Sequence, residues 1–273
     1  MSTRQKIVIN GNYEPVRPLA EAVTSYGQPS VAKVVYKGRR NTLFYILPGE
    51  DAGGGAVNSL DFPVNVKAFR IPPFPNGYVY RAFRPSKAKR SYLNALKLLE
   101  MGFRTPAPLG YSEIHTGLPL GKHGGIWPKM TRSFYFCEQL PYENLRSWEE
   151  FPDRDALIAA FGAEIARIHA AGIWFHDFSP GNILLRRDGK GNYEFYYVDL
   201  NRMEFGVHDM SKLMQMFKSI SWHDEWTAVL ARSYAEAAGK NPADISAQAV
   251  AAAHMWRERH GVKEKIKRLV GKA

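Results

Sequence analysis

A segment in the second half of the sequence, WFHDFSPGNILL, combines a carboxylate and an amide in a turn that leads into an apolar stretch. Asp177 and Asn182 stand five residues apart in it, and a later apolar stretch ends at Asp199. Asp, Ser, Pro, Gly and Asn all favour turns, so the segment is also explained as a plain connector between a helix and a strand. The position of Asp199 decides between a connector and a chemical site.

Asp199 is expected to lie beside Asn182. The segments NILLRR and YEFYYVD flank the turn residues DGKGN, which predicts a hairpin centred near Lys190. Asn182 then faces Val198, and Asp177, Asn182 and Asp199 converge at one end of the hairpin. Two carboxylates and an amide oxygen make a hard-oxygen site that suits Mg²⁺, completed by waters and substrate phosphates.

Such a site can serve phosphoryl transfer. This reaction requires a carboxylate near the acceptor hydroxyl, oxygen ligands for a metal, and a cation on the nucleotide phosphates. Lys67 in VNVKAF is the candidate cation, although taken alone it is more simply explained as a solvent-facing lysine on a half-buried strand. A strand lysine, a helix, a helical half, Asp-x4-Asn and a strand-terminal Asp follow one another in the order of the protein-kinase signature.

The elements that must position these residues begin with a strand-rich half. Five segments have the clustered apolar and β-branched residues of strands, at residues 31–36, 41–47, 62–70, 108–115 and 132–140. The Gly-rich polar segment 48–61 is predicted to be a loop, and a Gly- and Pro-bearing excursion separates the last two strands. Residues 86–99 predict a helix that begins at Ser86 and ends before Gly102. Its expected apolar face consists of Ala88, Tyr92, Ala95, Leu96 and Leu99.

The second half of the chain is predicted to be mainly helical. Residues 155–172 are apolar around most of a helix, as at the centre of a helical subdomain, and another helix begins near Asn241 and Pro242. The predicted fold class is α+β and bilobal, with an N-terminal antiparallel sheet plus one helix and a mainly helical C-terminal lobe. The expected boundaries are 1–137 for the N-terminal lobe, 138–141 for a hinge and 142–273 for the C-terminal lobe.

Composition limits the classes of partner. The 273 residues include 37 Lys and Arg against 26 Asp and Glu, and the net charge of +11 favours polyanions: nucleic acid, an anionic membrane surface or phosphorylated ligands. No zinc-ligand spacing or aromatic RNA-binding signature is visible, so no nucleic acid is expected. The N-terminus lacks an apolar signal-peptide core, no apolar run approaches the roughly 18 residues of a spanning helix, and the single Cys137 cannot form an internal disulfide. A soluble, cytoplasmic protein is expected.

The sequence resembles a known family at four segments: VNVKAFR, SKAKRSYLNALKLLEMGFRTPAPLGY, DFSPGNILL and FYYVDLNRMEFG. They are similar to the lipopolysaccharide kinase (Kdo/WaaP) family, members of the protein-kinase-like superfamily that phosphorylate sugars of the lipopolysaccharide inner core. The resemblance extends over residues 6–256, and its two C-terminal segments are the most specific. It implies a protein-kinase-like fold, ATP and Mg²⁺ as cofactors, and as acceptor a Kdo or heptose of the lipopolysaccharide core or another lipid-linked sugar.

The resemblance also implies a role for each reactive residue. Asp177 would be the catalytic base, Asn182 and Asp199 the metal ligands, and Lys67 the clamp on the nucleotide phosphates. The backbone of the hinge, Glu138 to Leu140, would meet adenine. Protein kinases carry a long activation segment with an A-P-E element after the metal-binding Asp, whereas DLNRMEFGVHDMSKLMQMF passes quickly into a helix. A protein acceptor is therefore disfavoured.

Two departures from the family pattern concern the residues around Lys67 and Asp177. The helix 86–99 contains no acidic residue to pair with Lys67; Leu93 stands near the expected position. Glu100 is about 10 Å further along the helix, at 1.5 Å per residue. The position two before Asp177, usually His in kinase-like loops, is Phe175, and the adjacent histidine is expected to be a packing or loop residue.

A third departure is the turn KGRRN, which has one glycine where a phosphate-covering loop often has several. Arg39 and Arg40 in this turn either hold phosphate or are simply solvated. These departures keep a second hypothesis open, a non-catalytic kinase-like (pseudokinase) module that binds nucleotide or an anionic glycolipid. Retention of all four reactive residue types favours the enzyme.

The C-terminal segment WRERHGVKEKIKRLVGKA predicts a basic amphipathic helix. Its apolar stripe consists of Val262, Ile266, Leu269 and Val270, with lysine and arginine on the remaining surface. Such a helix can lie in an anionic membrane interface, here the cytoplasmic face of the inner membrane. It can equally pack on the C-terminal lobe, with its lysines complementing the helix dipole.

Overall fold

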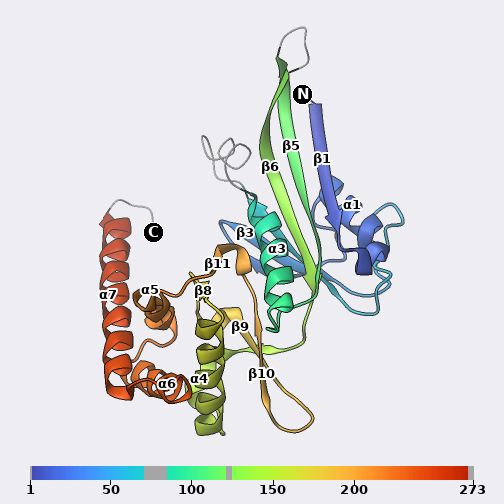
Figure 1. Cartoon of the computed structure of the whole chain (residues 1–273). Coiled ribbons are helices and arrows are strands. Elements are labelled where there is room, and N and C mark those ends of the chain that lie inside the picture. Colours follow the sequence, from blue (N-terminus) through green and yellow to red (C-terminus); the bar gives the residue numbers. More distant parts are fainter. Residues whose placement is uncertain (1, 71–84, 121–124, 270–273) are drawn as a thin grey trace. The chain divides into compact units, whose positions relative to one another are not determined.

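The computed structural model of the chain describes residues 2–70, 85–120 and 125–269, and the side chains of residues 3–70, 85–116 and 130–259. The chain divides into two compact units, Met1–Pro141 and Tyr142–Ala273. The first unit contains a large sheet with helices, and the second is mainly helical with short strands (Figure 1).

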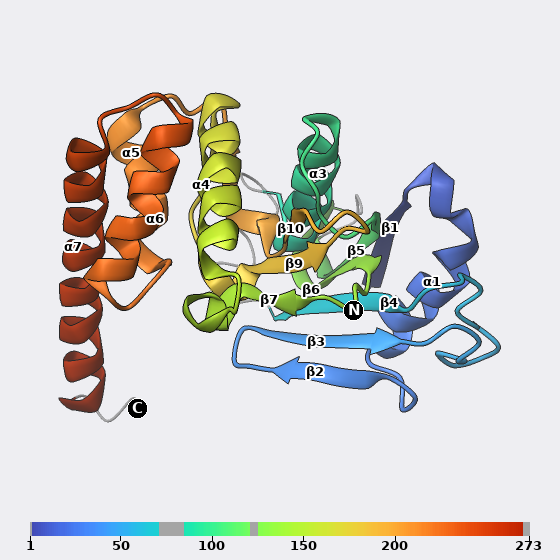
Figure 2. The ribbon, with the colours of Figure 1, turned by 90° about the horizontal axis from the view of Figure 1, so that it is seen from below.

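The first unit is built on a six-stranded antiparallel sheet with strand order β1-β5-β6-β4-β3-β2. Its strands are β1 (Ser2–Ile9), β2 (Lys33–Lys37), β3 (Asn41–Ile46), β4 (Val64–Arg70), β5 (Pro108–Leu120) and β6 (Gly125–Glu138). The neighbouring strands β2, β3 and β4 are seen side by side in Figure 2. The three predicted strands 31–36, 41–47 and 62–70 are confirmed as β2, β3 and β4.

Two parts of this unit differ from the prediction. β1 and α1 (Arg17–Tyr26), which follows the 3-10 helix η1 (Gly11–Val16), were not foreseen, so the described part of the unit contains α1 in addition to the predicted helix. β5 and β6 continue through the expected excursion and pair as far as Leu120 and Gly125. Pro119 and Pro128 lie beyond the residues of β5 and β6 that pair with β1 and β4 in the described ranges, so neither of those pairings needs the N–H that proline lacks.

α3 (Lys87–Glu100) confirms the predicted helix and its caps. The Ser86 hydroxyl accepts a hydrogen bond from the Lys89 amide at 2.9 Å, and Gly102 ends the helix with a positive φ of 78°. The buried face contains Ala88, Tyr92 and Ala95 as expected. Leu98 completes this face instead of Leu99, which is 41% exposed, because the helix is rotated slightly from the predicted orientation.

In the described part of the second unit, the helix α4 (Arg154–Ala170) packs against α6 (Asp224–Ala237), and α6 packs in turn against α7 (Pro242–Leu269). The short helix α5 (Met210–Met214) also contacts α7. α4 confirms the predicted central helix. Gly162 is needed on it because a Cβ atom there would come within 2.3 Å of the Ser233 hydroxyl of α6. The Asn241 side chain caps α7 by accepting a hydrogen bond from the Ala243 amide at 2.9 Å, as predicted.

The strands of the second unit form two small sheets. One has the order β10-β9-β7, from β7 (Glu143–Asn144), β9 (Ile183–Arg187) and β10 (Tyr193–Tyr197). The other pairs β8 (Ile173–Phe175) with β11 (Met203–Phe205). Four 3-10 helices connect these elements, η2 (Leu145–Glu150), η3 (Pro180–Asn182), η4 (Leu200–Arg202) and η5 (Gln215–Ser219).

Within the described ranges, every helix is too short or too polar to cross a lipid bilayer. α7 extends through the basic C-terminal segment as far as Leu269, but the side chains that would form its apolar stripe lie outside the described ones.

Candidate active site

A bed of aromatic side chains supports the segment from His176 to Asn182. Phe178 stacks on Phe161 of α4 at a centroid distance of 5.9 Å and lies 5.4 Å from Phe175 of β8. Phe175 in turn lies 5.0 Å from Tyr197 of β10. All four rings are buried, so they form a packed support for the polar residues of this segment. Phe175, which departs from the family pattern, is part of this support.

The loop that contains Asp177 is closed by the side-chain amide of Asn182. The Asn182 side-chain nitrogen donates to the Asp177 carbonyl at 3.2 Å, and the Asn182 backbone N–H donates to the Ser179 carbonyl at 2.9 Å. Because its nitrogen is used in this way, Asn182 has its side-chain oxygen left to meet a cation. The Asp177 side chain is exposed, and within the described ranges it accepts no hydrogen bond.

Asp199 reaches the same end of the hairpin. β9 and β10 pair in the predicted register, from Arg187 opposite Tyr193 to Ile183 opposite Tyr197, and the Val198 amide donates to the Asn182 carbonyl at 3.0 Å. Asp177, Asn182 and Asp199 are thus close together, as the sequence predicted. Their roles as base and metal ligands stay predictions.

The backbone at Asp199 is held in an uncommon conformation. Its φ of 59° and ψ of 46° are left-handed, and in the described part of the chain no other residue except glycine has a positive φ. The buried Asn201 side chain donates to Asp199 Oδ1 at 2.5 Å. Backbone strain of this kind persists where the surroundings enforce it, often at functional sites. Asn201, which the sequence did not single out, therefore orients the Asp199 carboxylate.

A divalent cation fits this site only if substrate phosphates and water complete its coordination. No group of three or more His, Cys, Asp and Glu side chains gathers around a possible metal position in the described ranges. The donors available are the Asn182 amide oxygen and the Asp199 carboxylate, both hard oxygen atoms. Mg²⁺ is commonly held by one or two protein ligands, with phosphates and water completing its coordination.

Several cations surround the loop. Arg146 packs against it, because a Cβ atom on Gly181 would come within 2.8 Å of the Arg146 guanidinium. Arg202 and Lys218 lie near His176, the residue before Asp177, and their charges lower the pKa of His176, on which burial has the larger effect. The sequence did not single out these three cations, although a lysine in the apolar segment MQMFKS is the same signal that marked Lys67.

In the first unit, Lys67 lies in the middle of β4. It pairs with Leu43 of β3 and with Tyr135 of β6, and its Nζ is 5.5 Å from the Phe69 ring centroid. Lys87 at the start of α3 approaches the same ring at 5.9 Å, so Lys67 is on the face of the sheet that α3 covers. Its role as a phosphate clamp stays a prediction.

The α3 residues near this face correct one expectation. Leu93 is 45% exposed and lies on the opposite side of the helix from the buried residues, so a glutamate at this position would not point at the sheet. Among the described residues, Glu113 of β5 is an acid on this face. Burial alone would raise the pKa of Glu113, but hydrogen bonds with His115 and Ser86, together with the charges of His115 and Lys6, outweigh it and lower the pKa. Glu113 thereby ties the start of α3 to the sheet.

The other residues predicted to bind nucleotide lie at the end of β6 and in the turn between β2 and β3. Glu138 ends β6, where its amide donates to the Ala107 carbonyl at 3.0 Å, and Leu140 is buried just beyond it. Arg39 and Arg40 are exposed in the turn between β2 and β3. Their roles in binding nucleotide stay predictions.

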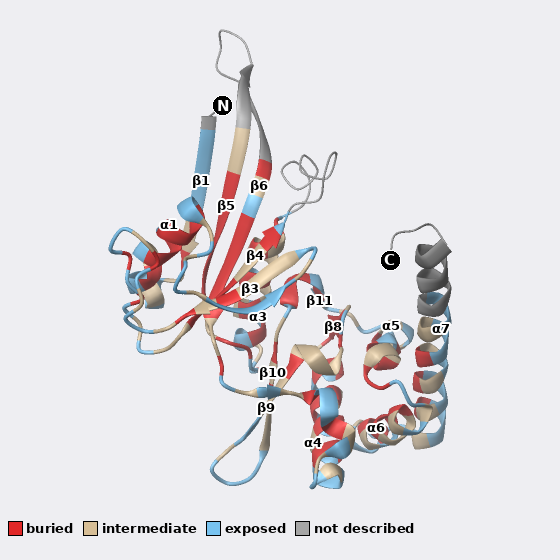
Figure 3. Cartoon of the chain, turned by 180° about the vertical axis from the view of Figure 1, so that it is seen from behind, coloured by how far each residue is buried: buried red, intermediate tan, exposed pale blue. Residues whose placement is uncertain are grey.

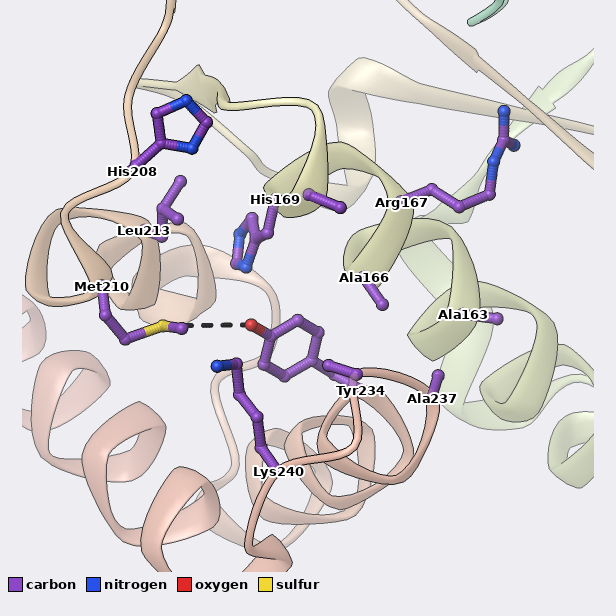
Figure 4. Close-up of a pocket in the computed structure, with 12 residues that line it drawn as sticks. Ala163, Ala166, Arg167, His169, His208, Met210, Leu213, Tyr234, Ala237 and Lys240 are labelled. Carbon is purple, nitrogen blue, oxygen red and sulfur yellow. Dashed lines mark hydrogen bonds between the residues drawn. The ribbon is translucent and has the colours of Figure 1, made fainter.

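The second unit contains a pocket of about 630 Å³ (Figure 4). Alanines of α4, the rings of His169 and Tyr234, and Lys240 line it. The two rings pack edge to face at 5.0 Å, and neither nitrogen of His169 has a hydrogen-bond partner within the described part of the chain. Burial, with a smaller effect of Lys240, lowers the pKa of His169 to about 4, so this histidine is neutral at neutral pH. None of the predicted site residues lines this pocket.

Similarity to known proteins identifies the family and the fold. The family model described as lipopolysaccharide kinase (Kdo/WaaP) family matches residues 97–234, just over half of the chain. No curated protein matches the sequence. A solved structure, WaaP in complex with acyl carrier protein, has a TM-score of 0.53 at 18% identity, over 93% of this chain and 97% of that chain. This likeness confirms the predicted α+β, protein-kinase-like fold.

A second solved structure is more distant. The Rio2 kinase-ADP/Mg2+-phosphoaspartate complex from Chaetomium thermophilum has a TM-score of 0.45 at 16% identity, over 90% of this chain and 77% of that chain.

Proposed function

We propose that this chain, which belongs to the lipopolysaccharide kinase (Kdo/WaaP) family, transfers the γ-phosphate of ATP to a sugar hydroxyl of the lipopolysaccharide inner core, on a Kdo or a heptose. The observation that carries the proposal is the end of the β9–β10 hairpin. An exposed carboxylate, an anchored amide and an oriented second carboxylate lie together there. These are the groups that phosphoryl transfer requires.

Asp177 is the proposed general base. Its carboxylate is exposed and, among the described residues, accepts no hydrogen bond that would have to break before it accepts a proton. The proton of the sugar hydroxyl passes to this carboxylate as the sugar oxygen forms a bond to the γ-phosphorus. The bond from that phosphorus to the β,γ-bridging oxygen breaks, and ADP leaves.

Asn182 and Asp199 are the proposed ligands of Mg²⁺. When bound, the ion would neutralise charge on the nucleotide phosphates. Asn182 can offer its oxygen because its nitrogen is anchored to the Asp177 carbonyl, and Asn201 holds Asp199 in place. Lys67 is the proposed cation on the phosphates, Glu138 to Leu140 the adenine contact, and Arg39 and Arg40 a further phosphate contact.

The acceptor is proposed from the family and from the shape of the segment after Asp199. Only η4, β11 and a short connection separate Asp199 from α5, which leaves little chain to bind a protein acceptor. The net charge of +11 suits an anionic glycolipid at a membrane surface. We place the reaction at the cytoplasmic face of the membrane, with the basic end of α7 as the membrane contact.

The test is a phosphotransfer assay on core oligosaccharides with the Asp177→Ala variant. Removal of a positioned base typically lowers the rate by about 10² to 10⁴. Affinity for Mg-ATP should change little, because Asn182 and Asp199 remain. Asp155→Ala is the matched control, since this aspartate has a side chain 98% exposed at the start of α4. Its turnover should equal that of the wild type.

Two results would count against the proposal. A parental rate in Asp177→Ala would remove Asp177 from the reaction. A wild-type protein that binds Mg-ATP but phosphorylates no core sugar would instead be the non-catalytic module.

A further inference from the structure

Lys218 is held beside the proposed base by a neighbouring contact. It lies on η5, and the next residue, Ser219, donates from its hydroxyl to the Phe178 carbonyl at 3.5 Å. Phe178 directly follows Asp177 and is fixed in the aromatic bed. η5 is thus attached to the loop at the residue next to the base. Lys218 is partly buried, with its Nζ 5.9 Å from the Trp174 ring centroid.

Arg202 approaches the same place from another element. It ends η4, and its carbonyl accepts a hydrogen bond from the His176 amide at 3.3 Å. The next residue, Met203, pairs with Phe175 in the small sheet. Arg202 and Lys218 therefore stand around the residue that precedes Asp177, although neither is near it in the sequence.

The two cations are not neutralised by ion pairs. Among the described residues, neither the Lys218 nor the Arg202 side chain forms a hydrogen bond or a salt bridge. Lys212 provides a contrast. It also lies over Trp174, at 4.4 Å, but is paired with Glu204 at 2.6 Å.

Electrostatics favours an anion at this place, most of all beside Lys218, which is partly buried whereas Arg202 is exposed. Burial lowers the pKa of Lys218; the Asp177 charge opposes this effect, and the Arg202 charge adds to it. The lowered pKa of His176 favours its neutral form, so this ring adds little positive charge. The nearby carboxylates are Asp177, which must itself accept a proton, and Glu204, which is paired with Lys212, so an anion beside the two cations would be favourable.

The position of the cations indicates which substrate brings that anion. Arg202 is hydrogen-bonded to the residue before Asp177, and Ser219, which follows Lys218, is hydrogen-bonded to the residue after it. The pair is therefore located beside the base, where the acceptor hydroxyl must lie. The loop from Asp177 to Asn182, DFSPGN, has no cation of its own.

We propose that Lys218 and Arg202 bind an anionic substituent, a carboxylate or a phosphate, of the sugar acceptor and thereby hold its hydroxyl at Asp177. This inference rests on the proposed phosphotransfer function. It makes Lys218 and Arg202 the residues that select an acidic sugar over a neutral one. Each cation would donate charge-assisted hydrogen bonds to the anion.

The experiment compares pairs of acceptors with and without the anionic group. Kdo and its methyl ester test a carboxylate, and a phosphorylated heptose and the same unmodified heptose test a phosphate. In Lys218→Met, KM for the charged member of the preferred pair should rise by about tenfold or more, since hydrogen bonds to charged groups are among the stronger ones. KM for the neutral member should stay near its wild-type value. Arg202→Met should behave similarly.

Matched variants separate charge from packing. Lys212→Met also removes a lysine from Trp174 but should leave both KM values unchanged, because Lys212 is already paired with Glu204. Lys218→Arg keeps the charge and should retain preference for the acidic sugar. An equal loss of kcat on charged and neutral acceptors would overturn the inference, since Lys218 would then act on the transferred phosphoryl group. Unchanged kinetics in Lys218→Met would overturn it too.

Calorimetric binding of the same sugars, without turnover, distinguishes failure of the inference from failure of the proposed function. If the wild type binds an acidic sugar more tightly than its neutral partner and Lys218→Met does not, the anion site exists even if no phosphate is transferred. If the wild type binds both members equally, the inference is wrong even if phosphate is transferred.

Discussion

The two faces of the sheet in the first unit have different composition. The face toward α1 carries a closed apolar core in which Phe44, Val66 and Phe136 are fully buried. A polar pair on that side is satisfied, with the Thr24 hydroxyl 2.7 Å from the Ser112 hydroxyl. The face toward α3 carries Lys67, Glu113, Tyr111, Tyr135 and Cys137. Burial along β4, β5 and β6 is shown in Figure 3.

The difference follows from the two-residue period of a strand. Val66 and Lys67 are neighbours in β4 but point to opposite faces, and so do Tyr135 and Phe136 in β6. One set of side chains can therefore stabilise the sheet while the alternate set is available for chemistry. The second unit shows a similar division between the aromatic bed and the polar loop above it. Substitutions of a core residue on the α1 face and of the reactive Lys67 on the α3 face should accordingly affect different quantities.

The largest effect is expected on the α1 face. Phe136→Ala should lower the free energy of unfolding by about 3–5 kcal/mol, because it leaves a cavity in a fully buried core. Denaturant unfolding measures this change, and kcat per folded molecule should be nearly unaffected. Leu93→Ala is the control, since this exposed leucine should change stability by less than about 0.5 kcal/mol. Equal effects of the two variants would contradict the division between the faces.

The next largest effect is expected on the α3 face, and it should appear in turnover rather than in the free energy of unfolding. Lys67→Met should lower turnover by about 10² to 10³, the typical effect of removing one group that stabilises developing charge. Its unfolding free energy should change little. Lys33→Met, at the exposed start of β2, should retain full activity. If Lys67→Met were to lose stability and keep its activity, Lys67 would be a structural residue.

The smallest effect concerns the attachment of α3. Glu113→Gln should cost about 1–3 kcal/mol of stability, as expected when a buried charged hydrogen-bond network is disrupted. Because the folded-state pKa of Glu113 lies below its ordinary value of 4.5, its contribution is fully present above pH 4.5. That contribution is lost as the pH falls through the folded-state pKa.

Unfolding measured from pH 6 to pH 3 should therefore show a smaller acid loss in Glu113→Gln than in the wild type. Glu100→Gln, exposed at the end of α3, serves as the control. An unchanged acid profile in Glu113→Gln would mean that Glu113 does not hold α3 to the sheet.

Local features were predictable from the sequence. The convergence of Asp177, Asn182 and Asp199 depends on a hairpin of fewer than twenty residues, and the turn sets its register. The caps of α3 and α7 depend on side chains within three residues of the helix ends. In each case the interacting groups are close in the chain, so their types and spacing were enough to predict the geometry.

Features that depend on distant contacts were decided by the tertiary structure. The rotation of α3 against the sheet buries Leu98 and exposes Leu93, and the pairing of β1 with β5 completes the sheet. Glu113 meets Ser86, and Lys218 comes near Asp177, only because packed elements bring together residues that are more than twenty-five positions apart. Sequence determined which side chains were available for chemistry, whereas packing between distant elements decided which of them became neighbours, because that packing depends on the combined burial of many side chains rather than on any local pattern.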